Sequence, residues 1–391
     1  MPNFKTDSLS VPKFPASFGD SKFLYRAIRG DDESLVRVQQ KNESFFIQIR
    51  AKNGGFLIKA DKISRPSQVV FVQQALRDFR DLCVCKAMFS NIEPQKVKSK
   101  VKFEVLKDID FFADEFKSDA EIWVEVGFGS GRHLLYQAKQ NPNIELIGLE
   151  IHKPSLEQVA KQCKLQSIKN IRLLDYDARI FLEFLSSNSV GRIFVHFPIP
   201  WDKKPHRRVI SSEFIDESIR VLKDGGKLEL RTDSQKYFNY SLVEFLKPEK
   251  VDLHINKNSD LDISSKYEDR WKKQEKNIYD VIMTNRHISD DKQRVGKIKF
   301  DKVFNFKTIK QKFEKIVRNE KDFFLHVEDI YEICDDEGLI KISFGASTKN
   351  ERVYVHFSKE KTSYFPNNIL ATKANQQAHY LLTKWLEGII K

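Results

Sequence analysis

One carboxylate and three glycines lie close together in residues 125–131, where the sequence reads EVGFGSG after an apolar run. Gly127, Gly129 and Gly131 can let the backbone approach a ligand closely, because glycine has no side chain and tolerates unusual backbone angles. A dinucleotide site instead uses G-x-G-x-x-G and backbone amides that face a pyrophosphate. Glu125 would repel that pyrophosphate, so the segment favours a nucleotide-type ligand whose other end is cationic.

Two more carboxylates follow apolar runs further along the chain. Glu150 comes after residues 146–149, and Asp177 comes shortly after residues 171–174. In open α/β sheets, ligands bind at the carboxyl ends of the strands. Glu150 can accept both hydroxyls of a ribose, and Asp177 can accept a hydrogen bond from an adenine amino group. Together with Glu125, they predict a class I methyltransferase site for S-adenosylmethionine; a dinucleotide-binding domain or a structural turn are the alternatives.

A basic loop at residues 197–208 reads FPIPWDKKPHRR. Its prolines restrict the backbone and lower the entropy lost when the loop becomes ordered. Lys203, Lys204, Arg207 and Arg208 are suited to contacts with nucleic-acid phosphates. Trp201 either stacks on a base or packs in the core, and we favour the core.

Two further segments place acids beside basic residues. Asp233 follows Arg231 and Thr232 at the end of the strand at residues 228–230, and residues 265–268 read SKYE ahead of a further basic and aromatic stretch. Alternating aromatic and basic side chains can stack on a single-stranded or flipped nucleotide and neutralise its phosphates. The alternative interpretation is a helix cap at Asp233 and a solvated charged helix at residues 265–276.

The elements that must position these residues alternate between strand and helix from about residue 120 to residue 285. Such alternation predicts a Rossmann-like parallel sheet with helices on both faces. A helix is expected at residues 132–139, directly after the glycines. The expected strands lie at 122–126, 145–149, 171–174, 192–197 and 227–231.

The terminal regions read as two small α+β domains without a catalytic motif. We expect a strand at 44–50, a turn at 53–55 and a helix at 68–84 in the first region. In the second, we expect a basic helix at 308–317 capped at Thr308, strands at 323–334, 339–344 and 352–357, and a helix at 374–390. The predicted domains are therefore residues 1–115, 116–290 and 291–391.

Charge and composition narrow the class of partner. The 391-residue chain has a formal net charge of +12, which favours a polyanionic partner or reflects a generally lysine-rich surface. Its four cysteines show neither metal-ligand spacing nor a disulfide framework, so no metal is predicted. The chain shows no signal region and no long apolar run, which predicts a cytoplasmic protein that does not enter a membrane. The lysines at 297–312 either contact nucleic acid or form a solvated face.

Taken in order, these segments resemble the bacterial tRNA (guanine-N7)-methyltransferase family over residues 120–285. The F-P-x-P-W loop and the SKYE segment are the specific parts of the resemblance, whereas class I methyltransferases in general share the rest. The resemblance implies transfer of a methyl group from S-adenosylmethionine to N7 of a guanine in tRNA. The regions outside residues 120–285 look like additions of a longer subtype.

The resemblance also implies roles for individual residues. The three acids at the strand ends match the family's cofactor-binding acids. Lys203 and Asp233 match substrate-binding residues. The guanosine-binding segment of the family matches Ser265, Lys266, Tyr267 and Glu268.

One position departs from the family. The family has an aspartate with a catalytic role between the two prolines of the loop, where this chain has Ile199. Isoleucine can neither accept a hydrogen bond nor offset a charge. Asp202 lies three residues on, and we expect it to take over the role of the missing aspartate.

Three other functions stay open at this point. The chain could methylate another substrate, it could bind tRNA without catalysis because of Ile199, or it could be a dinucleotide oxidoreductase. The first leaves the basic loop unexplained, and Glu125 argues against the last. The sequence leaves open whether the protein is a monomer or a homodimer.

Overall fold

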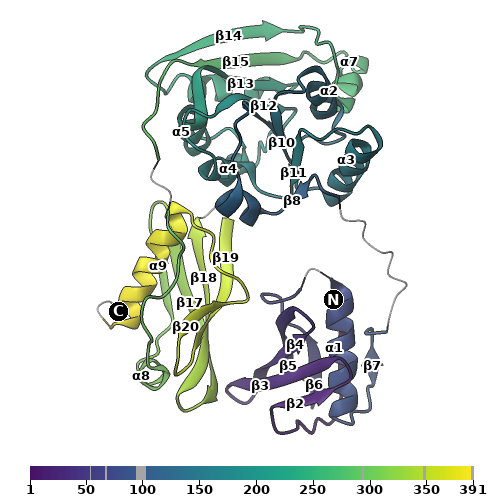
Figure 1. Ribbon diagram of the computed structural model, residues 1–391, viewed down its shortest axis with the longest axis vertical. Coiled ribbons are helices and arrows are strands. Elements are labelled where there is room, and N and C mark those ends of the chain that lie inside the picture. Colours follow the sequence, from purple (N-terminus) through teal and green to yellow (C-terminus); the bar gives the residue numbers. More distant parts are fainter. Residues whose placement is uncertain (53, 67, 94–102, 293–294, 347–348, 389–391) are drawn as a thin grey trace. The chain divides into compact units, whose positions relative to one another are not determined.

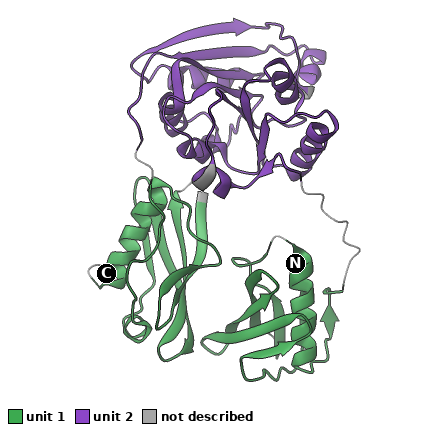
Figure 2. Ribbon diagram, viewed as in Figure 1, with its two compact units in different colours: residues 1–100, 295–391 green, residues 101–294 purple. Residues whose placement is uncertain are grey.

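The computed structural model describes residues 1–52, 54–66, 68–93, 103–292, 295–346 and 349–388, with the backbone alone at 114–115, 266–267 and 349. The chain divides into two compact units, shown in Figure 2. Residues 1–100 and 295–391 form unit 1, and residues 101–294 form unit 2. The predicted domain at residues 116–290 lies within unit 2, and the division into three domains stays a prediction.

Unit 2 contains a mixed sheet in the order β14-β15-β13-β12-β9-β10-β11-β8. Strands β8 to β13 pair in parallel, whereas β15 is antiparallel to both β13 and β14. The strands are β8 (Leu106–Lys107), β9 (Ile122–Val126), β10 (Glu145–Leu149), β11 (Ile171–Leu174), β12 (Val190–His196), β13 (Leu222–Thr232), β14 (Val251–Lys257) and β15 (Tyr279–Asn285).

Helices cover both faces of this sheet, with α2 and α3 on one side and α4 and α5 on the other (Figure 1). The predicted Rossmann-like α/β class is therefore confirmed. The helices are α2 (Arg132–Gln140), α3 (Lys153–Leu165), α4 (Ala178–Phe181), α5 (Ser212–Val221), α6 (Gln235–Phe245) and α7 (Lys266–Lys273), with a π-helical turn at Phe111–Glu115 and 3₁₀ turns at Leu182–Phe184 and Pro205–Arg207.

The central strands are apolar because both of their faces are covered. All five residues of β9 are buried, and the core between β9–β11 and helices α2 and α3 includes Trp123, Leu134, Leu146 and Val159. Three of the predicted strands have the predicted bounds, and β12 and β13 begin earlier than expected. The sheet order places β9 beside both β10 and β12, so the chain reverses its direction of winding at β9, where ligands bind in such sheets.

Unit 1 is built on antiparallel strands in the order β20-β19-β18-β17-β3-β4-β5-β6-β1-β7, with β2 beside β3 and β16 beside β17. Its strands are β1 (Asn3–Thr6), β2 (Ala16–Phe18), β3 (Ser21–Arg29), β4 (Glu33–Gln40), β5 (Glu43–Lys52), β6 (Gly55–Ala60), β7 (Phe89–Ser90), β16 (Ile316–Asn319), β17 (Phe324–Cys334), β18 (Glu337–Ala346), β19 (Lys349–Phe357) and β20 (Thr362–Phe365). Its helices are α1 (Val69–Leu82), α8 (Phe306–Gln311) and α9 (Lys373–Leu386).

The two sequence regions of unit 1 share buried polar contacts. The Tyr331 hydroxyl donates to Glu33 at 2.7 Å, and the Tyr354 hydroxyl donates to Asp61 at 3.0 Å. The predicted helix at 308–317 is wrong in extent, because α8 ends at Gln311 and β16 follows. Its cap is Asn305, whose side chain accepts from the amide of Thr308, rather than Thr308 itself. The expected turn at 53–55 includes residue 53, which lies outside the described residues.

No helix in the described part of the chain is long and apolar enough to span a membrane.

Candidate functional site

The glycine turn, residues 127–131, joins the buried strand β9 to helix α2. Gly127, Gly129 and Gly131 have φ angles of +70°, +53° and +73°, in the left-handed region that side chains disfavour. A Cβ at Gly131 would lie 2.4 Å from a methyl group of Val159, whereas a Cβ at Gly127 would meet nothing within 4 Å. Gly131 is therefore needed for packing of α2 on α3, and Gly127 leaves open space beside the backbone.

Glu150 lies half-buried beside this turn. One carboxylate oxygen accepts from the Gly129 amide at 2.9 Å, and the other accepts from the His152 amide at 2.9 Å. The Gly127 amide in turn donates to the carbonyl of Leu149 at 2.8 Å. These backbone contacts fix the turn against the end of β10, and the predicted contact of Glu150 with ribose hydroxyls stays a prediction.

Glu125 lies buried at the end of β9 and contacts a histidine that the sequence did not single out. Its carboxylate lies 2.8 Å from Nδ1 of His133, and both side chains are less than one-tenth exposed. Burial lowers the pKa of His133, but the charge and the hydrogen bond of Glu125 outweigh burial and raise it above its usual value. A cationic ligand group that reaches Glu125 would therefore share the carboxylate with the ring of His133.

His196, at the end of β12, lies against His133 with ring centroids 4.6 Å apart. Burial, with the charges of His133 and Arg231, holds the pKa of His196 well below its usual value. The pKa values of these two neighbouring histidines are thus shifted in opposite directions. In the sequence, the one sign of the contact between His133 and Glu125 is that His133 lies in the first turn of α2, next to the glycines.

Asp177 caps helix α4 and forms a bidentate ion pair with Arg179. The two Asp177 oxygens lie 3.0 Å from Nε and 2.6 Å from Nη2 of Arg179, and the amide of Arg179 donates to the first oxygen. Arg179 also donates to the carbonyl of His206 at 3.4 Å. Asp177 therefore reaches the basic loop through Arg179, and its predicted contact with adenine stays a prediction.

The basic loop, residues 197–208, contains both exposed and buried basic side chains. Lys203, Lys204 and Arg207 are exposed, as expected for residues that contact phosphates. Arg208 is buried, donates to the carbonyl of Pro200 at 2.8 Å and lies over the ring of Tyr240. In this structure Arg208 stabilises the loop from inside, so its side chain is not presented to a phosphate.

Asp202 and Ile199 both face solvent in this loop. The Asp202 side chain is 49% exposed and accepts from Arg208 at 3.4 Å, while Ile199 is 62% exposed. Trp201 is partly buried, with the guanidinium of Arg207 5.1 Å from its ring centre. Asp202 is thus the accessible carboxylate of the loop, held by one weak ion pair.

Asp233 lies after β13 and accepts from Lys276 at 2.9 Å. Helix α7 lies beyond it in the sequence, and its N-cap is Ser265, whose hydroxyl accepts from the amide of Glu268 at 3.0 Å. Glu268 is 1% exposed and pairs with Arg231. The side chains of Lys266 and Tyr267 lie outside the described residues, so their predicted contacts with guanosine stay predictions.

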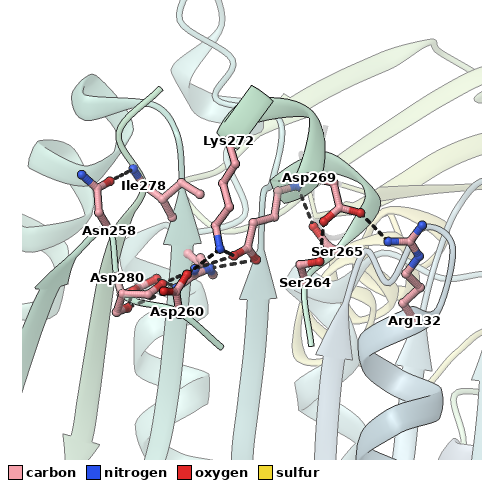
Figure 3. Close-up of polar contacts among 12 residues, drawn as sticks. Arg132, Asn258, Asp260, Ser264, Ser265, Asp269, Lys272, Ile278 and Asp280 are labelled. Carbon is pink, nitrogen blue, oxygen red and sulfur yellow. Dashed lines mark hydrogen bonds and ion pairs between the residues drawn. The ribbon is translucent and has the colours of Figure 1, made fainter. Parts of the chain in front are cut away.

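Three contacts join these elements at one edge of the sheet. Arg132, the first residue of α2, pairs with Asp269 of α7 at 2.6 Å, as Figure 3 shows. The Phe197 amide donates to the carbonyl of Arg231 at 2.7 Å, and Arg179 reaches His206. The glycine turn, the basic loop and α7 therefore surround the carboxyl ends of β9, β12 and β13. Among the described residues, no three His, Cys, Asp or Glu side chains are grouped to hold a metal ion.

The family model and the relatives that match this chain in sequence are methyltransferases. Residues 119–281 match the model of a family described as "Putative methyltransferase". The chain is 44% identical to a tRNA (guanine-N(7)-)-methyltransferase of Campylobacter jejuni, over 92% of each chain. It is 40% identical to another of that name from Campylobacter fetus, over 99% of each chain, and 43% identical to one from Wolinella succinogenes over 84%. An rRNA methylase structure from Streptococcus thermophilus aligns with 46% of this chain and 94% of its own at 13% identity, with a TM-score of 0.32.

Proposed function

We propose that this chain, which belongs to the tRNA (guanine-N7)-methyltransferase family, methylates N7 of a guanine in tRNA with S-adenosylmethionine. One observation carries the proposal beyond the family name. The glycine turn follows β9 and the exposed lysines of the basic loop follow β12, its neighbour in the sheet. This arrangement supports a site for a cationic nucleotide and a surface for phosphates at adjacent strand ends.

The residues at the turn fit S-adenosylmethionine. Open space beside Gly127 allows the ligand to approach the backbone, and Glu150 is already oriented by the Gly129 amide. We assign Glu125 to the ammonium of the cofactor, Glu150 to the ribose hydroxyls and Asp177 to the adenine amino group. The bound cofactor supplies a methyl group on a positively charged sulfur.

Attack by guanine N7 needs alignment more than it needs a base. N7 is an acceptor on the major-groove edge of the base and is largely unprotonated at neutral pH. The protein must hold N7 in line with the methyl group and exclude water. During transfer, the guanine gains positive charge. A nearby carboxylate stabilises that charge and can also accept hydrogen bonds from the N–H groups of the base.

We assign that carboxylate to Asp202. It is the accessible acid of the loop in which Ile199 replaces the family's aspartate, and its contact with Arg208 at 3.4 Å leaves acceptor capacity free. Lys203 and Asp233 are assigned to the substrate, and Lys203, Lys204 and Arg207 to its phosphates. We place the protein in the cytoplasm as part of the same proposal, because tRNA is located there. Whether the protein is a monomer or a homodimer stays open.

Nucleoside analysis tests the proposal directly. Unmodified tRNA is incubated with the protein and S-adenosylmethionine, digested and examined by mass spectrometry. We expect 7-methylguanosine to accumulate with time, and none to form with S-adenosylhomocysteine in place of the methyl donor. A different methylated nucleoside would support another acceptor, and cofactor binding without any product would support the tRNA-binding alternative.

A further inference from the structure

Helix α7 is too short and too polar to be stable by its own contacts. It has eight residues with the sequence KYEDRWKK, and isolated helices shorter than about 12 residues are marginal in water. Among its described side chains, only Glu268 is buried. The position of the SKYE segment must therefore depend on polar contacts with other elements.

A buried cluster of Arg231, Glu268 and Asp280 supplies those contacts; we name it the Arg231 cluster. Arg231 lies at 2.8 and 3.3 Å from the two oxygens of Glu268 and at 2.6 Å from Asp280. Each of the three residues is less than one-tenth exposed. The cluster joins α7 to both β13 and β15, strands that pair Arg231 directly opposite Asp280.

Both oxygens of the buried Glu268 carboxylate already accept from cations of the protein. One oxygen accepts from Arg231, and the other accepts from Arg231 and from Lys272 at 3.1 Å. Lys272 also pairs with Asp260 at 2.8 Å, and Figure 3 shows both side chains pointing toward the cluster. A base that displaced Arg231 from Glu268 would take away one of the two carboxylates that pair with this buried cation, which is unfavourable.

We propose that Glu268 and Arg231 are positioning residues, which hold the first turn of α7 over the sheet edge so that Ser265 and its neighbours can contact the acceptor nucleotide. This inference rests on the proposed function, because it concerns the segment assigned to guanosine. Asp269 and Arg132 attach the same helix turn to the start of α2. Together these contacts link the acceptor segment to the glycine turn.

A double-mutant cycle separates positioning from direct binding. The variants are Arg231→Gln, Glu268→Gln and the double variant, with methyl transfer to tRNA and affinity for S-adenosylhomocysteine measured for each. If Glu268 acts through Arg231, each single change lowers kcat/KM about tenfold and the double variant is no worse than the poorer single one. The cofactor affinity stays unchanged. If Glu268 binds guanine directly, the losses multiply, and that result would overturn the proposal.

Hydrogen exchange gives a readout that does not depend on activity. We expect faster exchange of the α7 amides in both single variants and in Glu268→Asp, which keeps the charge but shortens the reach. The matched control is Arg286→Gln, which removes an exposed pair with Asp252 from the same sheet and should change neither exchange at α7 nor activity. Unchanged exchange at α7 in the folded variants would refute the inference, whereas a wild-type protein that makes no 7-methylguanosine would refute only the proposed function.

Discussion

The glycine turn and helix α7 lie at the same sheet edge, but different interactions hold them. The turn is fixed by backbone conformation and by amide contacts among residues 127–150. Helix α7 is fixed by the ion pairs of Asp269 with Arg132 and of Glu268 with Arg231, and Arg231 in turn pairs with Asp280. The turn is a local device that tolerates little change in the backbone, whereas α7 depends on charges that are brought together by the whole sheet.

This difference predicts which changes each region tolerates. A substitution in the turn should act through steric strain and affect stability and cofactor binding together. A substitution in helix α7 or among its charged partners should act through charge and leave the cofactor affinity unchanged. The predictions below test this contrast, beginning with the largest expected effect.

Gly131→Ala should be the most damaging single change in the turn. The φ angle of +73° costs an L-residue about 1–2 kcal/mol, and the close contact with Val159 adds roughly 1–3 kcal/mol of overpacking. We therefore expect the free energy of unfolding, measured with urea, to fall by about 2–5 kcal/mol.

Gly127→Ala is the matched control for that substitution. Its φ angle of +70° carries the same backbone cost, but its Cβ meets no atom within 4 Å. Stability should fall by only about 1–2 kcal/mol, while affinity for S-adenosylhomocysteine should fall because the methyl group occupies the space assigned to the ligand. Equal losses of stability in the two variants would contradict the role of Val159.

Asp202→Ala should separate chemistry from cofactor binding. If the Asp202 carboxylate stabilises the charge that develops on guanine, its loss should lower kcat by about 10²–10³-fold. Affinity for the cofactor should be nearly unchanged, because Asp202 contacts only Arg208 among the residues described. Asp252→Ala, which removes another exposed carboxylate of an ion pair, should leave kcat unaltered. Turnover like that of the wild type in Asp202→Ala would end the assignment.

The turn was predictable from sequence because its physics is local. Three glycines after a buried strand and an acid at the end of the next strand require only neighbouring residues, and the strands at 122–126 and 145–149 were predicted with their observed bounds. The basic loop at residues 197–208 was likewise recognised from its own sequence, and its lysines are exposed. A glycine turn signal of this kind can be recognised from the local sequence without knowledge of tertiary contacts.

The acceptor side was less predictable because its partners are distant in the chain. Arg231 and Glu268 are 37 residues apart, and Arg132 and Asp269 are 137 residues apart. The basic run gave no sign that Arg208 turns inward to Pro200 and Tyr240 while Arg207 stays exposed. The sequence shows where basic residues occur, but not whether they are buried. An exposed cation can bind a ligand, whereas a buried cation stabilises the fold.

That distinction yields a prediction about salt. Lys203→Gln and Arg207→Gln should each weaken tRNA binding and reduce the slope of log affinity against log salt by about 1. Arg208→Gln should instead lower stability of the loop and leave the slope nearly constant, because Arg208 is buried. The control is Lys359→Gln, an exposed lysine of unit 1, in filter-binding measurements across a salt series. A slope that falls with Arg208 but not with Lys203 would reverse the assignment.

The smallest expected effect is the pH dependence of the histidines under the turn. The pKa of His133 is raised in the folded state by Glu125, so the pair stabilises the fold below the ordinary pKa of 6.5 and this stabilisation is lost as pH rises through the raised value. Relative to His133→Gln, the wild type should therefore lose its advantage in free energy of unfolding from pH 6 to pH 9.

His196 should show the opposite sign in the same measurements. Its pKa is held well below 6.5, so the folded state resists its protonation, and His196→Gln should relieve a loss of stability that grows as pH falls below 6.5. Urea unfolding of both variants at several pH values separates the two histidines from Glu229 and Arg192, which also act on His133 and remain in both variants. If the His133→Gln difference is independent of pH, then Glu125 is not paired with a charged imidazole.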